Sequence, residues 1–299
     1  MSLQVKCIKS SVAKVKSKWA QFLFGLEQLN ILPVIYSQEL EDERIERVKG
    51  KLGLILVEVA FEEGSKAKFW FDVAAHRRIF PWVVDDKELY FKIQYHEDHK
   101  QYSFVRPIAE SVFWPSKYFP SLESLRQIKL KQEYKYDILA IFKEYNKLNR
   151  RQCVEMILEQ PWNSCACVFN YKRLFPTVGS KGISGRFPYE EYLGYQAQSK
   201  ICISIQGRGY RCFRDTEVLG FGGCLLVLEP EGYIDFPHEY PCWITVKKDF
   251  SDFVEKVDYF LSHDKEREEM ALHGLEYYEK YLSPAAVVNS TINQCKELI

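Results

Sequence analysis

Short, uninterrupted apolar runs recur through the second half of this 299-residue chain, and helical stretches separate them. Three such runs are 136–142, 165–170 and 201–205. A strand that is apolar at consecutive positions is buried on both faces, which is typical of parallel sheets covered by helices. The helical pattern of residues 149–160, ended by Pro161, completes a βαβ unit, and such crossovers are right-handed. The sequence therefore predicts a parallel α/β sheet in this half.

The remaining elements of the second half continue this alternation of strands and helices. We expect strands at 224–228 and 244–246, helices at 188–198, 213–221, 249–262 and 265–282, and a glycine-rich loop at 179–186. Strands that alternate with helices indicate a Rossmann-like arrangement.

The first half is less regular. We expect helical structure over 1–30 and 38–49, and strands at 31–36, 52–60, 69–72 and 90–93. These elements suggest a small or reduced α/β layer. Three prolines make 106–133 the best candidate for a linker. We place a first domain at 1–120 and a second at 121–299, with the option that the last helix packs back on the first domain.

Composition limits the classes of partner. The chain has 41 basic and 41 acidic residues, whereas a dedicated nucleic-acid-binding protein usually shows a basic excess. Only the lysine-rich stretch 6–18 resembles a basic stripe, and we interpret it as a solvated helix face. Contact of this stretch with nucleic acid or with a membrane surface is the alternative.

Cysteine usage and hydropathy bear on location. The nine cysteines are scattered without a CxxC pair, which favours reduced thiols in a cytoplasmic protein. No apolar run reaches the roughly 18 residues of a membrane-spanning helix, and no signal-peptide pattern opens the sequence. We therefore expect a cytoplasmic protein that does not span a membrane. Peripheral membrane contact and the oligomeric state stay open.

Residues 199–230 carry the strongest functional signal, in the order strand, glycine loop, short helix, strand. Ligands of parallel sheets bind at the carboxyl ends of the strands, and Gly207 and Gly209 allow a ligand to approach the backbone there. Arg214 lies in the first helical turn, where free N–H groups favour phosphate. Glu217 shares a helix face with Arg214 and can accept both hydroxyls of a ribose. The alternative is a surface i,i+3 ion pair.

The pattern SKI-x5-G…R-x-x-E-x-x-x-x-G resembles the carboxyl-terminal domain of GT-B glycosyltransferases, especially the exostosin-like and spore-maturation-type groups. Residues 249–284 resemble the paired helices that follow in those families, and 85–95 weakly resembles a segment of some exostosin-like enzymes. The matching residues are Ser199, Lys200, Gly207, Arg214, Glu217 and Gly222. The resemblance implies an α/β fold of two Rossmann-like domains, the first small or reduced.

The resemblance also implies residue roles and an activity. Glu217 would bind the ribose, Arg214 the diphosphate, and the 207–209 loop with Arg208 would lie against the donor. The protein would move a sugar from a nucleotide-diphosphate donor to a hydroxyl of a glycan or small molecule, without metal or cofactor. Many relatives carry a sugar-contacting Glu where this chain has Gly209. A catalytically inactive nucleotide-binding or interaction protein is therefore the alternative.

Other residues are candidates for the same site. Lys181 and Arg186 of the glycine-rich loop could contact the diphosphate, or the loop is simply solvated. An inverting enzyme needs a base in the first domain, and His76 is the choice because basic residues follow it. The other residues considered as the base are Asp72, Asp85, Asp86, His96 and His99. The His96-x-x-His99 spacing could also suggest metal, but we prefer an exposed hairpin or loop.

Overall fold

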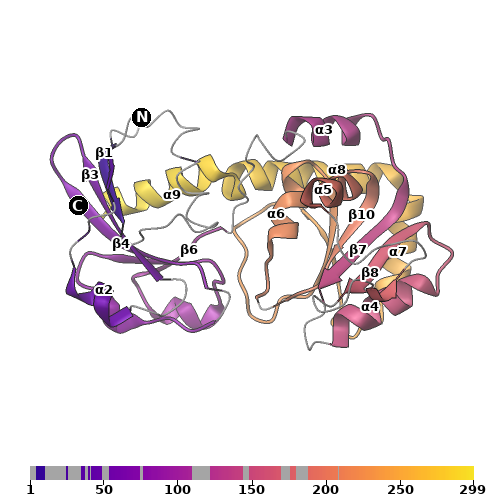
Figure 1. Ribbon diagram of the computed structural model, residues 1–299, viewed down its shortest axis with the longest axis horizontal. Coiled ribbons are helices and arrows are strands. Elements are labelled where there is room, and N and C mark those ends of the chain that lie inside the picture. The colour runs from indigo at the N-terminus through magenta and orange to yellow at the C-terminus, as the bar shows by residue number, and fades with distance from the viewer. Residues whose placement is uncertain are drawn as a thin grey trace.

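Six strands of the second half form one sheet in the order β12-β11-β10-β7-β8-β9, as seen in the computed structural model (Figure 1). The strands are β7 (Tyr136–Lys143), β8 (Ser164–Phe169), β9 (Pro176–Gly179), β10 (Ser199–Ser204), β11 (Cys224–Leu228) and β12 (Ile244–Val246). All neighbouring pairs are parallel except β8 and β9. The structure describes residues 5–10, 25, 35–37, 40, 42–48, 54–74, 77–109, 122–143, 148–169, 176–179, 188–207 and 209–299.

Alternate residues of the central strands point to opposite faces of this sheet. On β7, Ile138, Ala140 and Phe142 join an apolar cluster with residues of α4 (Leu148–Leu158) and α7 (Phe253–Ser262). Leu139 and Ile141 join the cluster on the other face, which residues of four further helices enter. These helices are α3 (Leu122–Leu130), α5 (Tyr189–Ala197), α6 (Phe213–Gly220) and α8 (Asp264–Tyr277). Both faces are covered, so the α/β class and the Rossmann-like second half are confirmed.

The first half forms a second six-stranded sheet in the order β2-β1-β3-β4-β5-β6. Its strands are β1 (Val5–Ser10), β2 (Ile35–Ser37), β3 (Leu54–Phe61), β4 (Lys66–Asp72), β5 (Leu89–Lys92) and β6 (Val105–Pro107). The shorter elements are α2 (Glu43–Val48), η1 (Pro81–Val83) and η2 (Glu97–Gln101). β3 pairs antiparallel with both β1 and β4, whereas β4, β5 and β6 are parallel. The first half therefore contains a mixed sheet with as many strands as the sheet of the second half.

One local prediction is wrong, and two elements lie where none was expected. Residues 5–10 lie in β1 rather than in a helix, because they pair with β2 and β3 and thereby bury Val5 and Ile8. The expected linker contains the helix α3, whose Leu125 is fully buried. β9 also occupies a place for which no strand was expected. For β1 and α3 a partner distant in the sequence decides the local structure, whereas β9 pairs antiparallel with the preceding strand β8.

The last helix, α9 (Pro284–Lys296), runs from the second sheet to the first (Figure 1). It begins at Ser283, whose hydroxyl accepts a hydrogen bond from the backbone N–H of Ala286 at 3.3 Å, and Pro284 occupies the first turn. At its far end Lys296 lies 3.5 Å from Glu63 of the β3–β4 turn. α9 also contacts β4 directly. The chain end therefore links the two halves.

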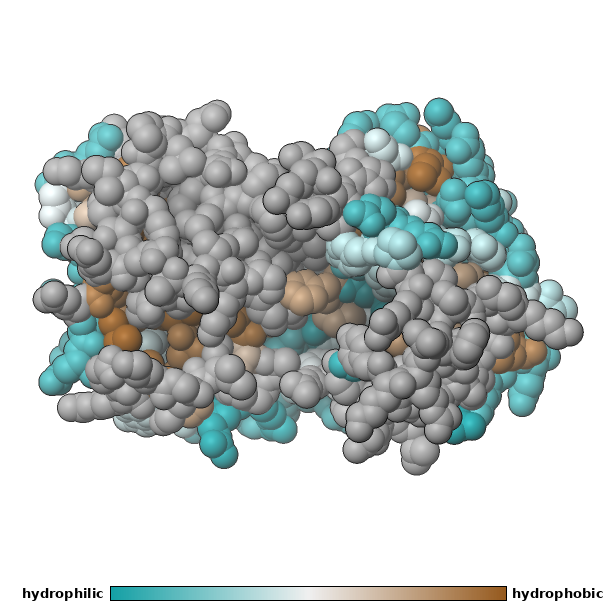
Figure 2. All heavy atoms as spheres, viewed as in Figure 1, coloured by the Kyte–Doolittle hydropathy of each residue, from teal (hydrophilic) through white to brown (hydrophobic). Residues whose placement is uncertain are grey.

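One apolar cluster extends through both halves of the molecule. It contains Phe61 and Phe91 of the first sheet together with Leu225 of the second and Val288 of α9. The visible described surface of the second half is mainly hydrophilic (Figure 2). None of the helices in the described part of the chain combines the length and apolarity that crossing a bilayer demands.

Candidate functional site

The start of α6, at the carboxyl end of β10, is held by a buried carboxylate. Asp215 accepts a hydrogen bond from the backbone N–H of Cys212 at 3.2 Å and another from the Ser204 hydroxyl. Acidic groups are favourable at a helix amino terminus, where backbone N–H groups lack helical partners. Asp215 is only 3% exposed, so it supplies negative charge at the helix end from within the protein.

Arg214, one residue before this cap, points toward α5 and β7. Its Nε donates to the Tyr192 hydroxyl at 2.7 Å and its Nη2 to the carbonyl of Ile141 at 2.5 Å. The guanidinium lies 5.0 Å from the centre of the Phe142 ring. Its buried Nη1 has no hydrogen-bond partner among the described residues. This nitrogen retains a donor for an anionic group.

Glu217 lies one turn further along α6 and is 2% exposed. Its Oε1 accepts from the Tyr189 hydroxyl, and its Oε2 accepts from Gln196 Nε2 at 2.8 Å. Burial raises the pKa of Glu217, although these hydrogen bonds act in the opposite direction. Both Arg214 and Glu217 therefore contact tyrosines of α5, which excludes the surface ion pair considered as the alternative.

The structure explains why position 209 is a glycine, which the sequence context did not reveal. A Cβ at this position would lie 2.7 Å from Cδ of Gln94, a side chain of the first half. The Gln94 amide oxygen accepts from the backbone N–H of Tyr210 at 2.8 Å, and its nitrogen donates to the carbonyl of Arg211 at 3.0 Å. The absence of a side chain at 209 thus allows the first half to dock on the loop before α6. Gly207 in the same loop is buried.

Arg211 is a site residue that sequence reasoning missed. It pairs with Asp235 through Nε at 2.8 Å and Nη2 at 2.7 Å, and its guanidinium lies 4.0 Å from the Trp243 ring centre. Arg211 and Asp235 line a cavity of about 50 Å³ together with Ile93 and other residues of the first half. The only sequence signal was an arginine in the glycine loop, and nothing in the sequence connects it with Asp235.

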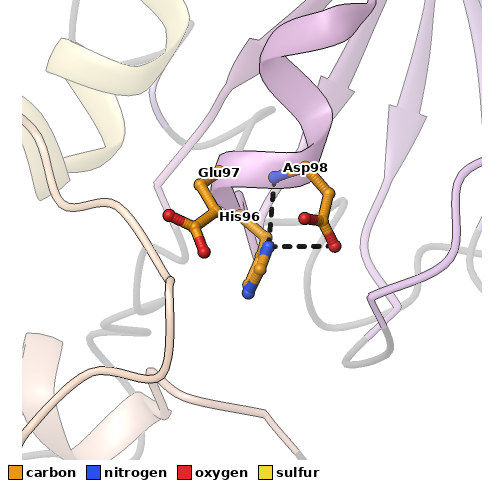
Figure 3. A group of neighbouring side chains, drawn as sticks. All are labelled: His96, Glu97 and Asp98. Atoms are coloured by element: carbon orange, nitrogen blue, oxygen red, sulfur yellow. Dashed lines mark hydrogen bonds and ion pairs between the residues drawn. The ribbon is translucent and has the colours of Figure 1, made fainter.

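Two of the residues considered as catalytic bases are buried, and one of them, His96, contacts the second half. The His96 ring accepts a hydrogen bond at Nδ1 from the backbone N–H of Asp98 at 3.2 Å (Figure 3). Its Nε2 lies 2.9 Å from the carbonyl of Glu231. His99 Nδ1 in turn accepts from the backbone N–H of His96 at 3.1 Å. Both histidines are buried, so the expected exposed hairpin or loop is wrong. Burial also lowers the pKa of His99.

His96, Glu97 and Asp98 place three potential metal ligands close together. The geometry of His96 argues against this use, because its Nδ1 accepts a backbone hydrogen bond and its Nε2 faces a carbonyl oxygen that requires a proton there. A metal at either nitrogen would break one of these hydrogen bonds. The cluster is better explained as the cap of η2.

The aspartates considered as bases are also placed by the structure. Asp72 is fully buried, 3.0 Å from Lys92 Nζ, and accepts from the Tyr90 hydroxyl at 2.6 Å. Asp85 and Asp86 are exposed, and Asp85 lies 2.7 Å from Arg44. A substrate cannot reach a fully buried carboxylate, so Asp72 is excluded as the catalytic base.

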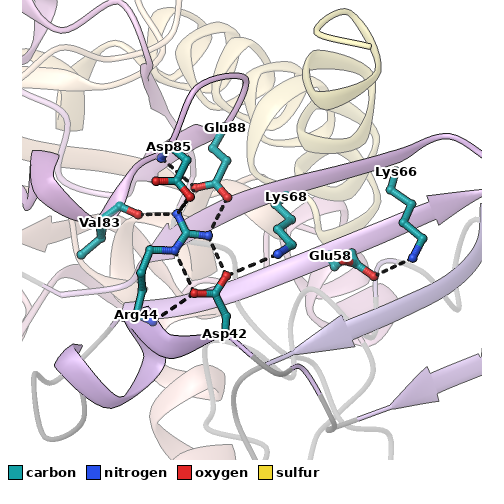
Figure 4. A network of polar contacts seen from close by, with 8 residues as sticks. All are labelled: Asp42, Arg44, Glu58, Lys66, Lys68, Val83, Asp85 and Glu88. Carbon is teal, nitrogen blue, oxygen red and sulfur yellow. Dashed lines mark hydrogen bonds and ion pairs between the residues drawn. The ribbon is translucent and has the colours of Figure 1, made fainter.

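Arg44 organises a buried polar network in the first half (Figure 4). Its guanidinium donates to Glu88 at 2.7 and 2.8 Å, to Asp42 at 2.7 and 2.8 Å, and to the carbonyl of Val83 at 2.8 Å. The paired guanidinium holds the pKa of Asp42 well below its usual range. Every described partner is satisfied within the network, so we assign it a structural role.

Four predicted site residues lie outside the described residues. They are His76, Lys181, Arg186 and Arg208. The described residues thus bring Gly207, Gly209, Arg214 and Glu217 to one end of the second sheet, while the roles of these four stay predictions.

Residues 157–292 match a protein-family model described as glycosyl transferase-like. No curated protein matches the sequence. One similar structure is the C-terminal domain of a glycosyl transferase group 1 family protein (LpcC) from Francisella tularensis. It has 13% identity and a TM-score of 0.36 over 55% of this chain and 94% of that chain. Another is a GtfA/B complex, with 12% identity and a TM-score of 0.35 over 81% of this chain and 67% of that chain. Over 157–292 the sequence is therefore similar to glycosyl transferase-like proteins.

Proposed function

We propose that the second half binds a nucleotide-diphosphate sugar and that the protein transfers the sugar to a hydroxyl of a glycan or small molecule. The observation that carries this proposal is the convergence of Arg214 and Glu217 on α5, beyond the carboxyl end of a parallel strand. This is the part of a parallel sheet where ligands bind. The family match over 157–292 supports the same class of reaction.

The contacts of these residues suggest how a donor would be held. A ribose hydroxyl would replace the Tyr189 hydroxyl at Glu217 Oε1, and a phosphate oxygen would accept from Arg214 Nη1. Arg208, Lys181 and Arg186 are the further cations expected at the diphosphate. Positive side chains and helix N–H groups can stabilise a leaving diphosphate without metal. His76 is the proposed base, and a cytoplasmic location is part of the proposal.

Calorimetric titration of the full chain with UDP, GDP, ADP and CMP tests donor binding. We expect one nucleotide to bind, and Glu217→Ala to weaken its binding by about tenfold or more, since hydrogen bonds to a charged group contribute about 1.5–3 kcal/mol. Glu255→Ala is the matched control, because Glu255 is exposed on α7. If none of the nucleotides binds, or if both variants bind like the wild type, the proposal is wrong.

Gln94 favours a second candidate, a nucleotide-binding protein without transferase activity. Its amide occupies the space of a side chain at Gly209, where many GT-B enzymes carry a sugar-contacting carboxylate. Nucleotide binding without hydrolysis of any donor sugar, and without transfer to a panel of acceptors, would favour this candidate. Release of the nucleoside diphosphate from a donor sugar would favour the transferase.

A further inference from the structure

A separate cavity of about 330 Å³ lies at the amino ends of β10 and β11, between α3 and α8. Lys200 and Cys224, at the starts of these strands, line it. The candidate nucleotide site lies beyond the carboxyl end of β10, at the opposite edge of the same sheet. The two sites therefore share no wall residue among those named above. Pockets of this volume are large enough for a small organic ligand.

A buried lysine without a carboxylate partner forms part of the wall. Lys129 is 9% exposed, and its ammonium donates to the backbone carbonyl of Ser199. The ammonium lies 5.0 Å from the ring centre of Tyr134 and 5.7 Å from that of Phe221. No carboxylate of the described residues forms an ion pair with it, although Glu123 and Glu268 also line the cavity. A buried ammonium is costly unless an anion or a full set of acceptors surrounds it.

A second buried cation increases this local positive charge. Arg267 is 3% exposed, and its guanidinium lies 6.0 Å from the centre of the same Tyr134 ring. Its carboxylate partner, Asp264, is 2.5 Å away but has a side chain that is 72% exposed. The other cations of the wall, Arg126 and Lys200, are paired with Glu279 and Asp137. Lys129 is therefore the cation of the cavity that has an acceptor but no anion among the described residues.

The lip of the cavity carries two exposed leucines beside the exposed polar residues Glu123, Gln132 and Glu268. Leu130 of α3 is 74% exposed and Leu272 of α8 is 54% exposed, and both line the cavity. Hydrophobic atoms reach the surface over α3 within a hydrophilic surrounding (Figure 2). A ligand that lies between these two leucines would remove their apolar side chains from water.

We propose that this cavity binds a small carboxylate with an apolar body, such as a medium-chain or aryl-substituted acid. The carboxylate accepts from Lys129, and the apolar body lies against Leu130, Leu272 and Phe221. The charge of Lys129 and the two exposed leucines select an amphiphilic anion over a neutral amphiphile or a small inorganic anion. This site takes no part in the nucleotide binding proposed above.

Calorimetric titration of the full chain with octanoate, octanol, octyl phosphate and acetate tests this site. We expect octanoate to bind about tenfold or more tightly than octanol, because only the anion pairs with the ammonium, and acetate to bind weakly because it lacks the apolar body. Octyl phosphate separates the two kinds of anion: tighter binding than octanoate would overturn the choice of a carboxylate. Equal affinity for octanoate and octanol would overturn the whole proposal.

Lys129→Met keeps the shape of the side chain and removes its charge. We expect it to reduce octanoate affinity by about tenfold or more and to leave octanol affinity unchanged. Lys131→Met is the matched control, since Lys131 is exposed and lies outside the cavity wall. Leu272→Asn retains the ammonium, adds no charge and should weaken octanoate and octanol alike, which covers the case in which the first variant fails to fold. Unchanged octanoate affinity in folded Lys129→Met would contradict the proposal, whatever the result of the nucleotide titration.

Discussion

At the scale of the residue, Glu217 is buried at a cost in folding free energy and is the residue proposed to bind the ribose. The carboxylate is buried on α6, and only Tyr189 and Gln196 of α5 donate to it among the described side chains. Burial outweighs these hydrogen bonds and raises the pKa of Glu217 above its ordinary value of 4.5. The ionised side chain therefore destabilises the folded protein in the absence of a ligand, as is common at binding sites.

The pH dependence of stability follows from this shift. Because the folded state retains the Glu217 proton to a higher pH than the unfolded chain does, stability is lost as pH rises above about 4.5, the value for the unfolded chain. Glu217→Gln removes this pH-dependent loss of stability, because glutamine does not ionise. We expect the variant to gain stability relative to the wild type between pH 4 and pH 8, measured by urea unfolding. A difference that stays constant over this range, or that Glu255→Gln reproduces, would contradict the assignment.

At the scale of the element, the loop between β10 and α6 is shaped by a side chain from the first half of the chain. Gln94 bonds to the backbone of Tyr210 and Arg211, and these contacts use the space left open by Gly209. The backbone at Gly209 is not among the positive-φ glycines, so an L-residue is tolerated there conformationally. The glycine is therefore required by the packing of Gln94 and not by the backbone angle.

A double-mutant cycle tests this explanation. Gly209→Ala in the wild type should cost about 1–3 kcal/mol of unfolding free energy, because Gln94 must move and lose its hydrogen bonds. In the Gln94→Ala background the same substitution should be neutral or stabilise by up to about 1 kcal/mol, since alanine reduces the freedom of the unfolded chain. Denaturant unfolding of the four proteins measures the coupling. Equal effects of Gly209→Ala in both backgrounds would show that Gln94 is not the reason for the glycine.

At the scale of the whole molecule, α9 and a shared apolar cluster join the two halves. The cluster contains residues of both sheets, and Ile292 of α9 belongs to it and is fully buried. A core shared by both halves couples their unfolding, because neither half can lose its packing alone. The two sheets should therefore unfold together.

A substitution in α9 tests this coupling. Ile292→Ala should reduce stability by about 2–5 kcal/mol through lost burial and the cavity left behind. Hydrogen exchange should show increased opening in strands of both sheets, as expected for a single cooperative unit. Asn293→Ala, at an exposed position of the same helix, serves as the control. Increased exchange confined to one sheet would show that the halves unfold independently.

The strands of the second half could be predicted from the sequence because burial on both faces leaves a continuous apolar run. The runs at 136–142, 201–205 and 224–228 correspond to β7, β10 and β11 within two residues at either end. The short helix after Gly209, with Arg214 and Glu217 on it, was also expected and is α6. For these elements, the apolar pattern of the sequence matches the burial of the residues in the folded protein.

Tertiary structure alone decided the rest. β1 is a strand because two distant strands flank it, and α3 is a helix that packs Leu125 into the core despite the prolines before it. The role of Gly209 depends on Gln94, which lies 115 positions earlier in the sequence numbering and is brought there by the fold. Sequence periodicity reports which faces are buried, but not which distant side chain covers them. The sequence by itself therefore determined the parallel sheet and its glycine loop. Tertiary packing within the second half determined what surrounds Arg214, Glu217 and Lys129, and the packing of the two halves determined what covers Gly209.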